Sequence, residues 1–300
     1  MDLAESYTQM RPQLLSIAYN MLGSLSEAED VVQDVYFRIH RLAERAGDDA
    51  DQPPIESPGA YLTTITTRLA LDQLRSARLA RRAYPGAWLP EPVLTDPGPG
   101  PGEHTELAET LSLALLTVLE RLTPTERAVF LLHESFGYAY DEIARILGKS
   151  EANCRQIGAR ARRHLAAHRP RFDVASERHQ ELTDRFVAAC REGQVEQLLE
   201  MLTADAVAYT DGGTRVRAAL RPIYGRDKVA RFLAGIARSG GDVVLRSIWV
   251  NGQPARLVLD AQGHNIIGVL TLDIVGDQVQ TVRLIVNPDK LRHLPEALGQ

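Results

Sequence analysis

The segment 123–171 constrains the fold more than any other part of this 300-residue chain. Thr123 followed by Pro124 and Glu126 is typical of a helix start, because the hydroxyl and the carboxylate can cap free amide groups. The next apolar run keeps helical spacing and stops at Gly148, a residue type that readily ends a helix. A further helical segment begins directly after it. Two short helices joined by a glycine-containing turn predict a helix-turn-helix.

The last helix of this segment, from Glu151 to about His168, indicates a nucleic-acid partner. Residues 151–175 hold six arginines in a chain whose net charge is −5. Arginine suits guanine and phosphate, and asparagine or glutamine suits adenine, so this helix is predicted to enter the DNA major groove. A solvated basic helix is the alternative. The polar side chains available for the groove are Asn153, Arg155, Gln156, Arg160, Arg162 and Arg163.

Length and composition limit the number of domains and argue against a membrane protein, a secreted protein and a metal-binding protein. Two or three domains are expected at this length, and no apolar run is long enough to cross a membrane. The acidic N-terminus lacks a secretory signal, and Cys154 and Cys190 lack metal-ligand spacing, so we expect a cytoplasmic protein with no metal or cofactor. Charge alternates locally: residues 1–57 carry 4 basic and 11 acidic side chains, whereas 58–82 carry 5 and 1.

The second basic block is a predicted helix that starts at Pro58. Tyrosine, threonine and arginine side chains on its exposed side suit unstacked bases and phosphates, although an ordinary amphipathic basic helix is the alternative. The preceding helix, over residues 27–39, combines a buried valine face with an acidic one. Taken alone, that acidic face is most simply a solvated surface.

These motifs, in this order, resemble bacterial sigma factors of the small extracytoplasmic-function (ECF) group. Leu14 to Phe37, with the motif Ala28-Glu29-Asp30-Val31-Val32-Gln33, resembles the polymerase-binding helix pair, and residues 61–75 resemble the promoter-melting segment. Residues 123–165 resemble the reader of the upstream element. The resemblance implies core RNA polymerase (its β′ clamp and β flap) and promoter DNA as partners. Arg68 stands where many members have Asn.

The resemblance carries roles to three groups of residues. Core polymerase binding falls on Glu29, Asp30, Gln33 and Asp34. Contacts with the −10 element fall on Tyr61, Arg68, Asp72, Arg75 and Arg78. Contacts with the −35 element fall on Asn153, Arg155, Gln156, Arg160 and Arg163.

A proline- and glycine-rich stretch separates the two blocks and predicts an extended linker. Trp88 and Leu89 are unusual in a solvated tether, so we expect them to dock on a neighbouring surface. A local plug on the adjoining domain is the alternative. The predicted domains are 1–83 (region 2), 84–106 (linker), 107–171 (region 4) and 176–300.

The final domain carries 15 basic and 15 acidic side chains and offers no general DNA affinity. Two helices, a strand, an extended stretch over 216–220, a third helix and four strand-like runs predict an α+β domain with a curled antiparallel sheet. That order resembles the SnoaL-like superfamily of cone-shaped folds, some of which are enzymes. Asp211, Asp273 and His264 are candidate general bases, but no acid–base pair is evident, so a non-enzyme is expected.

Trp88-Leu89-Pro90-Glu91-Pro92, Asp211-Gly212-Gly213 and Asn287-Pro288-Asp289-Lys290-Leu291 together resemble motifs of the sigma subgroup with a fused SnoaL-like tail, which includes the SigJ type. That resemblance implies a tail that replaces a separate anti-sigma protein, docks on the linker and the two DNA-binding domains, and sets their spacing. The residues implicated are Trp88, Leu89, Asp211, Asn287, Asp289 and Lys290. Two alternatives stay open: a one-component regulator with a ligand-sensing pocket, and a SnoaL-like enzyme with a DNA-binding appendage. A small-molecule ligand of the tail also stays open.

Overall fold

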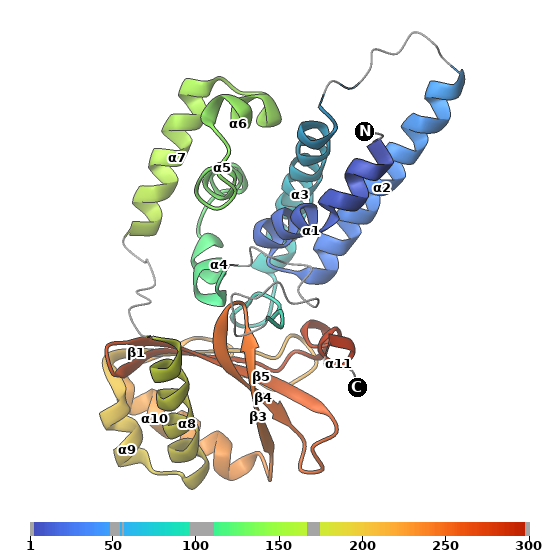
Figure 1. Cartoon of the computed structure of the whole chain (residues 1–300). Coiled ribbons are helices and arrows are strands. Elements are labelled where there is room, and N and C mark those ends of the chain that lie inside the picture. Colours follow the sequence, from blue (N-terminus) through green and yellow to red (C-terminus); the bar gives the residue numbers. More distant parts are fainter. Residues whose placement is uncertain (1–2, 49–54, 56, 96–110, 167–174, 298–300) are drawn as a thin grey trace. The chain divides into compact units, whose positions relative to one another are not determined.

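The computed structural model describes residues 3–48, 55, 57–95, 111–166 and 175–297 (Figure 1). The chain divides into two compact units. The helical unit comprises Met1–Arg82, Thr105–Leu111 and Leu116–Arg169, and the tail unit comprises Ala83–His104, Ser112–Leu115 and Pro170–Gln300. The described part of the linker, residues 84–95, therefore groups with the tail rather than with either helical block.

The first module of the helical unit consists of three helices, α1 (Leu3–Leu22), α2 (Leu25–Asp48) and α3 (Pro58–Arg82). Helix α1 packs against both of the others and buries Leu14 and Ile17 completely or nearly so. Gly23 ends α1 with a φ of 68°, a conformation that costs glycine little. The apolar faces expected from the sequence form the core of this module.

The second module contains α4 (Leu113–Leu119), α5 (Pro124–Glu134), α6 (Tyr140–Leu147) and α7 (Glu151–Ala166). The predicted capping box is present, since the Glu126 amide donates to the Thr123 hydroxyl at 3.3 Å and the Thr123 amide donates to the Glu126 carboxylate at 2.9 Å. Gly148 ends α6 with a φ of 63°. Helices α5 to α7 form the predicted helix-turn-helix, hereafter the HTH module.

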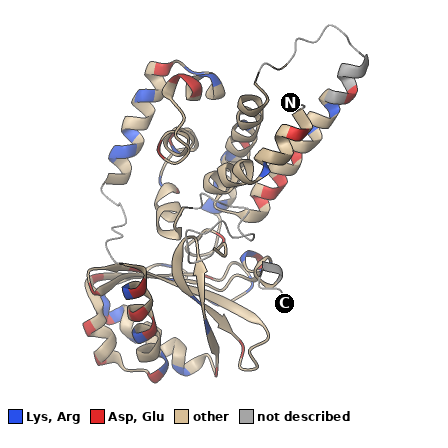
Figure 2. Cartoon of the chain, viewed as in Figure 1, with Lys and Arg blue, Asp and Glu red and all other residues tan. Residues whose placement is uncertain are grey.

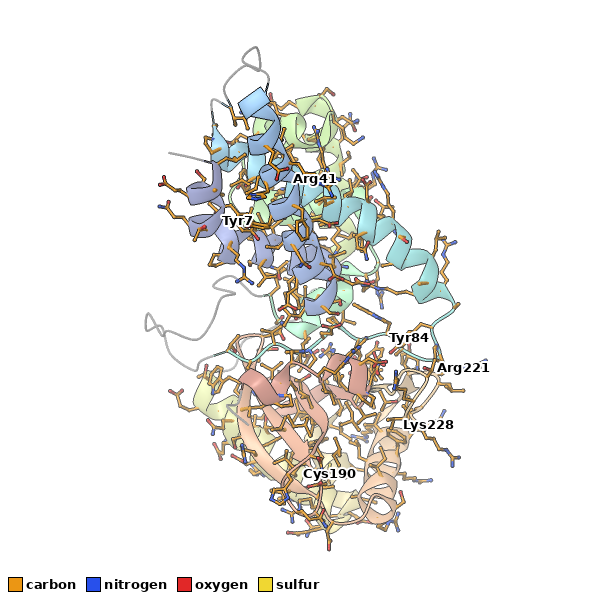
Figure 3. All side chains as sticks on the ribbon, turned by 90° about the vertical axis from the view of Figure 1, so that its right-hand side faces the viewer. Tyr7, Arg41, Tyr84, Cys190, Arg221 and Lys228 are labelled. Carbon is orange, nitrogen blue, oxygen red and sulfur yellow. The ribbon has the colours of Figure 1, made fainter. Side chains whose placement is uncertain are left out.

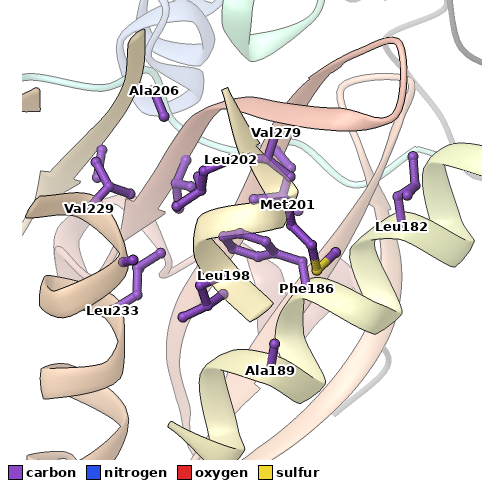
Figure 4. Packing of buried hydrophobic residues seen from close by; sticks show 14 of the residues in the cluster. Leu182, Phe186, Ala189, Leu198, Met201, Leu202, Ala206, Val229, Leu233 and Val279 are labelled. Carbon is purple, nitrogen blue, oxygen red and sulfur yellow. The ribbon is translucent and has the colours of Figure 1, made fainter. Parts of the chain in front are cut away.

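The tail packs three helices against one face of a six-stranded sheet whose order is β2-β1-β6-β5-β4-β3. Phe186, Leu198 and Leu272 lie in the core between them (Figure 4). The elements are α8 (Ser176–Glu192), α9 (Val195–Met201), β1 (Leu202–Asp211), β2 (Ile223–Tyr224), α10 (Arg226–Ser239), β3 (Val244–Val250), β4 (Gln253–Leu259), β5 (Ile266–Val275), β6 (Gln278–Ile285), a 3₁₀ turn (Pro288–Lys290) and α11 (Leu294–Ala297).

Two details of the tail differ from the expectation. The sheet is mixed, because β1 runs parallel to β6 while every other neighbouring pair is antiparallel. The long connection through α10 takes the chain to the far edge, and three hairpins then return it beside β1. Residues 216–220 form no strand, since the Ala219 amide bonds to the Thr210 hydroxyl at 2.8 Å instead of joining a ladder.

The opposite face of the sheet has a second apolar core. Leu257, Val269 and Ile285 point to this face because side chains alternate along each strand. Leu291 and Leu294 from the end of the tail pack there, together with Leu89 of the linker. The predicted docking of the linker is therefore part of the hydrophobic packing of the tail unit.

Candidate nucleic-acid interface and linker site

The proposed −35 residues lie along the exposed side of α7, where Figure 2 shows a row of basic residues. Asn153, Gln156 and Arg163 are exposed. Arg155 forms an exposed pair with Glu151 one turn earlier, at 2.5 Å, and its guanidinium lies 5.2 Å from the centre of the Tyr140 ring. Such exposed pairs are weak, so these side chains can turn to another anion at little cost.

Arg160 lies closer to the body of the HTH module. Its guanidinium is 3.7 Å from the carboxylate of Glu126, and His164 lies 3.8 Å from the same group. Burial raises the pKa of Glu126, but hydrogen bonds from Thr123 and the charges of His164 and Arg160 outweigh it and hold the pKa below its ordinary value. Glu126 therefore both caps α5 and orients Arg160.

The proposed −10 residues on α3 are not equivalent. Asp72 and Arg75 form an exposed ion pair at 2.7 Å, and Tyr61 is half-buried. Arg68 and Arg78 are different, because both donate hydrogen bonds to backbone carbonyls beyond the first module. The structure therefore does not bring the five side chains into one free surface.

The four proposed polymerase-binding residues are all exposed on α2, which carries the acidic row visible in Figure 2. Glu29 and Gln33 also line a cavity of about 300 Å³ between α1 and α2, with Tyr7 and Tyr36 beside them. Tyr36 stacks on His40 with 5.7 Å between ring centres. This side of the module combines acidic and aromatic groups.

The linker site is built around a buried ion pair in the tail unit. Lys290 reaches Asp211 at 2.7 Å, and the two side chains are 7% and 0% exposed. The Leu89 amide donates to the same Asp211 oxygen, at 2.8 Å, and the Lys290 ammonium also donates to the Leu89 carbonyl. The same ammonium lies 4.1 Å from the centre of the Trp88 ring, a cation–π distance. Each charge in this site therefore meets the linker directly.

Tyr84 is a member of this site that the sequence did not single out. Its hydroxyl donates to Asp211 at 2.5 Å and accepts from the Asn287 amide at 2.9 Å. Burial and the bond to Asp211 raise the pKa of Tyr84. Figure 3 labels this side chain beside the tail. Tyr84 precedes a Pro-Gly pair and belongs to no apolar pattern. Its role depends on the hydrogen bond to Asp211, which lies far away in the sequence.

The Asp211-Gly212-Gly213 turn is fitted closely to this site. A Cβ on Gly213, whose φ is 59°, would lie 2.7 Å from the Asn287 side chain. Asp289 does not touch the linker among the described contacts. It pairs instead with Arg215 at 3.2 Å. The structure thus joins five of the six predicted residues directly and puts Asp289 in a supporting position.

The end of the linker pairs with strand β3. Leu94 forms an antiparallel bridge with Val250, and the Asn251 amide donates to the Val93 carbonyl at 2.9 Å. The Val93 amide donates to the Asn251 side chain at 3.0 Å. Asn251 is buried with a φ of 52° in the β3–β4 turn, so it serves both the turn and the linker. Sequence analysis did not identify Val93 or Asn251.

A separate cavity of about 340 Å³ lies on the helix-bearing face of the tail sheet. Its lining is mainly apolar and includes Phe186, Leu233 and Leu270. Burial raises the pKa of the Cys190 thiol at this cavity to about 12, which keeps it protonated at neutral pH. The cavity is therefore a mainly apolar pocket.

None of the three candidate general bases lines this cavity. Asp211 is held by the linker, Asp273 forms a two-bond pair with Arg283 at 2.7 and 2.8 Å, and His264 is exposed in a turn. Within the described part of the chain, no group of three or more His, Cys, Asp and Glu could hold a metal ion. No helix in the same part is long and apolar enough to cross a membrane.

Comparison with known proteins agrees with this geometry. Sigma-70 region 2 matches residues 6–80, and sigma-70 region 4 matches residues 112–165. The ECF RNA polymerase sigma factor SigJ of Mycobacterium tuberculosis is 35% identical over 80% of this chain and 75% of its own length. The probable sigma factor SigI of the same species is 34% identical over 96% of this chain and 94% of its own.

A solved structure extends the match to the tail. The crystal structure of M. tuberculosis SigJ covers 96% of this chain and 98% of its own, with a TM-score of 0.73 and 29% identity. The expected arrangement of two all-α sigma domains followed by an α+β domain is confirmed. The chain belongs to the ECF RNA polymerase sigma factors, which bind core RNA polymerase and direct transcription initiation at promoters.

Proposed function

We propose that this sigma factor is regulated in cis by its own tail, which acts by holding the linker between the two DNA-binding modules. The observation that supports this most is the buried Asp211–Lys290 pair, to which Leu89 and Tyr84 of the linker are hydrogen-bonded. Breaking one half of a buried pair costs about 3–5 kcal/mol, so the linker is held firmly. No separate anti-sigma protein is required for such control.

Holding the linker limits the reach of the tether. Residues 84–95 could span roughly 40 Å if extended, at about 3.4 Å per residue, and the tail removes this length from the tether. A tail that prefers one arrangement of the two modules shifts the population by its differential contacts. The tail therefore sets which promoter spacings the two modules can read together.

Transcription with core polymerase tests this regulation. We would compare the full chain with Lys290→Met and Trp88→Ala, and with chains ending near Pro288 and near Arg171, on genomic promoter templates. Arg215→Gln is the control, because Arg215 pairs with Asp289 and not with the linker. We expect transcription output or promoter choice to change in the two substituted chains and in the two shortened chains, relative to the full chain. Unchanged transcription from all of them would remove the regulatory proposal.

We also propose that α7 reads the −35 element through Asn153, Arg155, Gln156, Arg160 and Arg163, and that α3 reads the −10 element through Tyr61, Arg68, Asp72, Arg75 and Arg78. The double variant Arg155→Ala with Arg160→Ala should lose about 1–3 kcal/mol of discrimination for each base contact removed. Promoter selection measured in vitro is the test, with Arg191→Ala in the tail as the control. Unaltered selection would show that α7 is assigned wrongly.

The core polymerase is proposed to bind the row Glu29, Asp30, Gln33 and Asp34, through its β′ clamp, and the HTH module through its β flap. Removing the three carboxylates together should weaken binding and reduce its salt dependence. Co-migration of the purified chain with core polymerase at low salt measures this. Failure of the wild-type chain to bind would favour the one-component regulator instead.

A second candidate function is supported by the apolar cavity of the tail. We propose that it takes a small, largely apolar molecule, since burial of apolar surface is what its lining offers. Asp211, Asp273 and His264 do not line the cavity, and the mainly apolar lining favours binding. A fluorescent probe of apolar sites such as anilinonaphthalene sulfonate should bind the full chain, and Leu270→Trp, which fills the space, should abolish the signal. Equal binding by both chains would contradict this.

A further inference from the structure

The stretch of the tail that leads from the Asp211-Gly212-Gly213 turn into α10 gathers positive charge. Residues 214–231 carry 6 basic and 1 acidic side chains, whereas the remaining residues of 176–300 carry 9 basic and 14 acidic ones. Arg215 pairs with Asp289. The other five cations are exposed and form no ion pair within the described part of the chain: Arg217, Arg221, Arg226, Lys228 and Arg231.

Large apolar side chains project from the same stretch. Leu220 is 71% exposed, Tyr224 is 62% exposed and Val216 is 39% exposed. The backbone around them is fixed, because the Ala219 amide donates to the Thr210 hydroxyl at 2.8 Å and Tyr224 belongs to the outer strand β2. We call these three side chains and the five unpaired cations the basic–apolar surface.

The stability of the fold does not account for these cations. Arg226 and Lys228 lie in the first turn of α10, where the helix dipole disfavours positive charge. Lys228 and Arg231 are three residues apart on the same helix, so two like charges are neighbours. Figure 3 shows Arg221 and Lys228 at one edge of the tail. Positive charge that costs the fold stability, and that has no counter-charge in the described chain, indicates an anionic partner outside it.

Helix α7 shows how this surface differs from one that suits nucleic acid. On α7 the exposed arginines are accompanied by Asn153 and Gln156, and no large apolar side chain is exposed among its described residues, 151–166. Amide and hydroxyl groups supply many of the contacts that proteins make with phosphates and bases. Residues 214–231 contain no Asn, Gln or Ser, and their exposed uncharged groups are mainly apolar. A nucleic-acid backbone offers little to a projecting leucine, whereas the interface of a lipid bilayer buries it.

We infer that the basic–apolar surface docks the chain on a bilayer that contains anionic phospholipid. Leu220 and Tyr224 enter the interface, and the cations around them meet the phosphate groups of the lipid. Each cation close to an anionic leaflet strengthens binding about fivefold, and salt weakens this contribution. The contact is peripheral and needs no membrane-crossing helix. It goes beyond the proposed function, since neither the linker site nor the apolar cavity takes part.

Cosedimentation of the full chain with lipid vesicles tests the inference. Phosphatidylcholine vesicles with about 30% phosphatidylglycerol are compared with pure phosphatidylcholine vesicles. Arg217→Gln with Arg221→Gln removes two cations from the surface. Arg185→Gln with Arg246→Gln is the matched control, because it removes two exposed arginines elsewhere in the tail.

The apolar part of the surface has its own pair of variants. Leu220→Ser removes the most exposed apolar side chain and empties no core position. Val244→Ser is the control, since Val244 is an apolar residue of β3 that is 42% exposed. Arg155→Ala with Arg160→Ala removes two cations from α7 and separates the tail from the DNA-reading helix.

We expect the wild-type chain, both controls and the α7 variant to bind the anionic vesicles and not the neutral ones. The variant that lacks two surface cations should bind about 30-fold more weakly. Leu220→Ser should bind about tenfold more weakly, because its side chain no longer leaves water for the interface. Binding that does not depend on phosphatidylglycerol, or that Leu220→Ser leaves unchanged, would overturn the inference. Loss of affinity for a DNA duplex of arbitrary sequence in the two-cation variant, with vesicle binding unchanged, would assign the surface to nucleic acid instead.

Discussion

The linker site and the Glu120 cluster of the helical unit, in which Glu120 pairs with both Arg81 and Arg127, are both ion clusters that hold separate segments together, but water reaches them differently. At the linker site Asp211 and Lys290 are 0% and 7% exposed, and Leu89, Tyr84 and Gly213 donate further hydrogen bonds to Asp211. In the Glu120 cluster Arg127 is 1% exposed, but Glu120 is 24% and Arg81 is 11% exposed. Charges that water can reach are released at lower cost than charges that are enclosed. The linker is thus held by an enclosed ion pair, whereas water reaches one side of the Glu120 cluster.

The largest effect should follow from breaking the enclosed cluster. Asp211→Asn leaves the Lys290 ammonium buried without its counter-charge, so the tail unit should lose about 3–5 kcal/mol of unfolding free energy. Chemical denaturation of the full chain measures the loss. Asp277→Asn removes an exposed pair with Arg178 and should cost less than about 1 kcal/mol. Equal losses in the two variants would mean that the linker site is not a dry ion pair.

A similar but smaller loss should come from the apolar half of the same site. Leu89→Ala removes a fully buried side chain from the second core of the tail, at an expected cost of about 2–5 kcal/mol. Leu79→Ala on α3, where the side chain is 66% exposed, should change stability little. Hydrogen exchange at the Asn251 amide, which bonds to Val93, should quicken in the first variant only. Protection that survived Leu89→Ala would show that the linker is held elsewhere.

The smallest effect should be the response of the Glu120 cluster to pH. Burial raises the pKa of Glu120, but Arg127 and Arg81 outweigh it and hold the pKa below the ordinary value of 4.5. The stabilisation is therefore complete above that value and is lost as the pH falls through the lower, folded-state pKa. Between about pH 5 and the acid unfolding of the chain, the free energy of unfolding, measured by chemical denaturation, should fall further in the wild type than in Glu120→Gln. Equal losses in the two chains would assign the response to another group.

Much of the fold could be predicted because local signals were strong. The caps at Thr123 and Gly148 are local, and a few residues suffice to read them. Trp88 and Leu89 were identifiable as docked residues because apolar side chains are out of place among prolines and glycines. The parallel pairing of β1 with β6 was not predictable, since it depends on where α10 returns the chain.

The site was harder to predict wherever its contacts join distant segments. Arginines on α3 indicate an anionic partner, but the pattern does not separate a DNA phosphate from the last carbonyls of a neighbouring helix. Arg68 and Arg78 were therefore assigned to DNA alone. Tyr84 was missed because its partners, Asp211 and Asn287, follow more than 120 residues later.

The bridge between Leu94 and Val250 bears on why the tail is joined to the rest in a single polypeptide. Strand β3 is an outer strand, and an uncovered outer strand invites pairing with other molecules. If a protease cut the chain, or the gene were split, between residues 166 and 176, the linker segment that contacts β3 would belong to the other fragment. Keeping both pieces in one polypeptide avoids a separate tail with an uncovered edge strand, and it makes the supply of regulator and regulated protein equal in every cell.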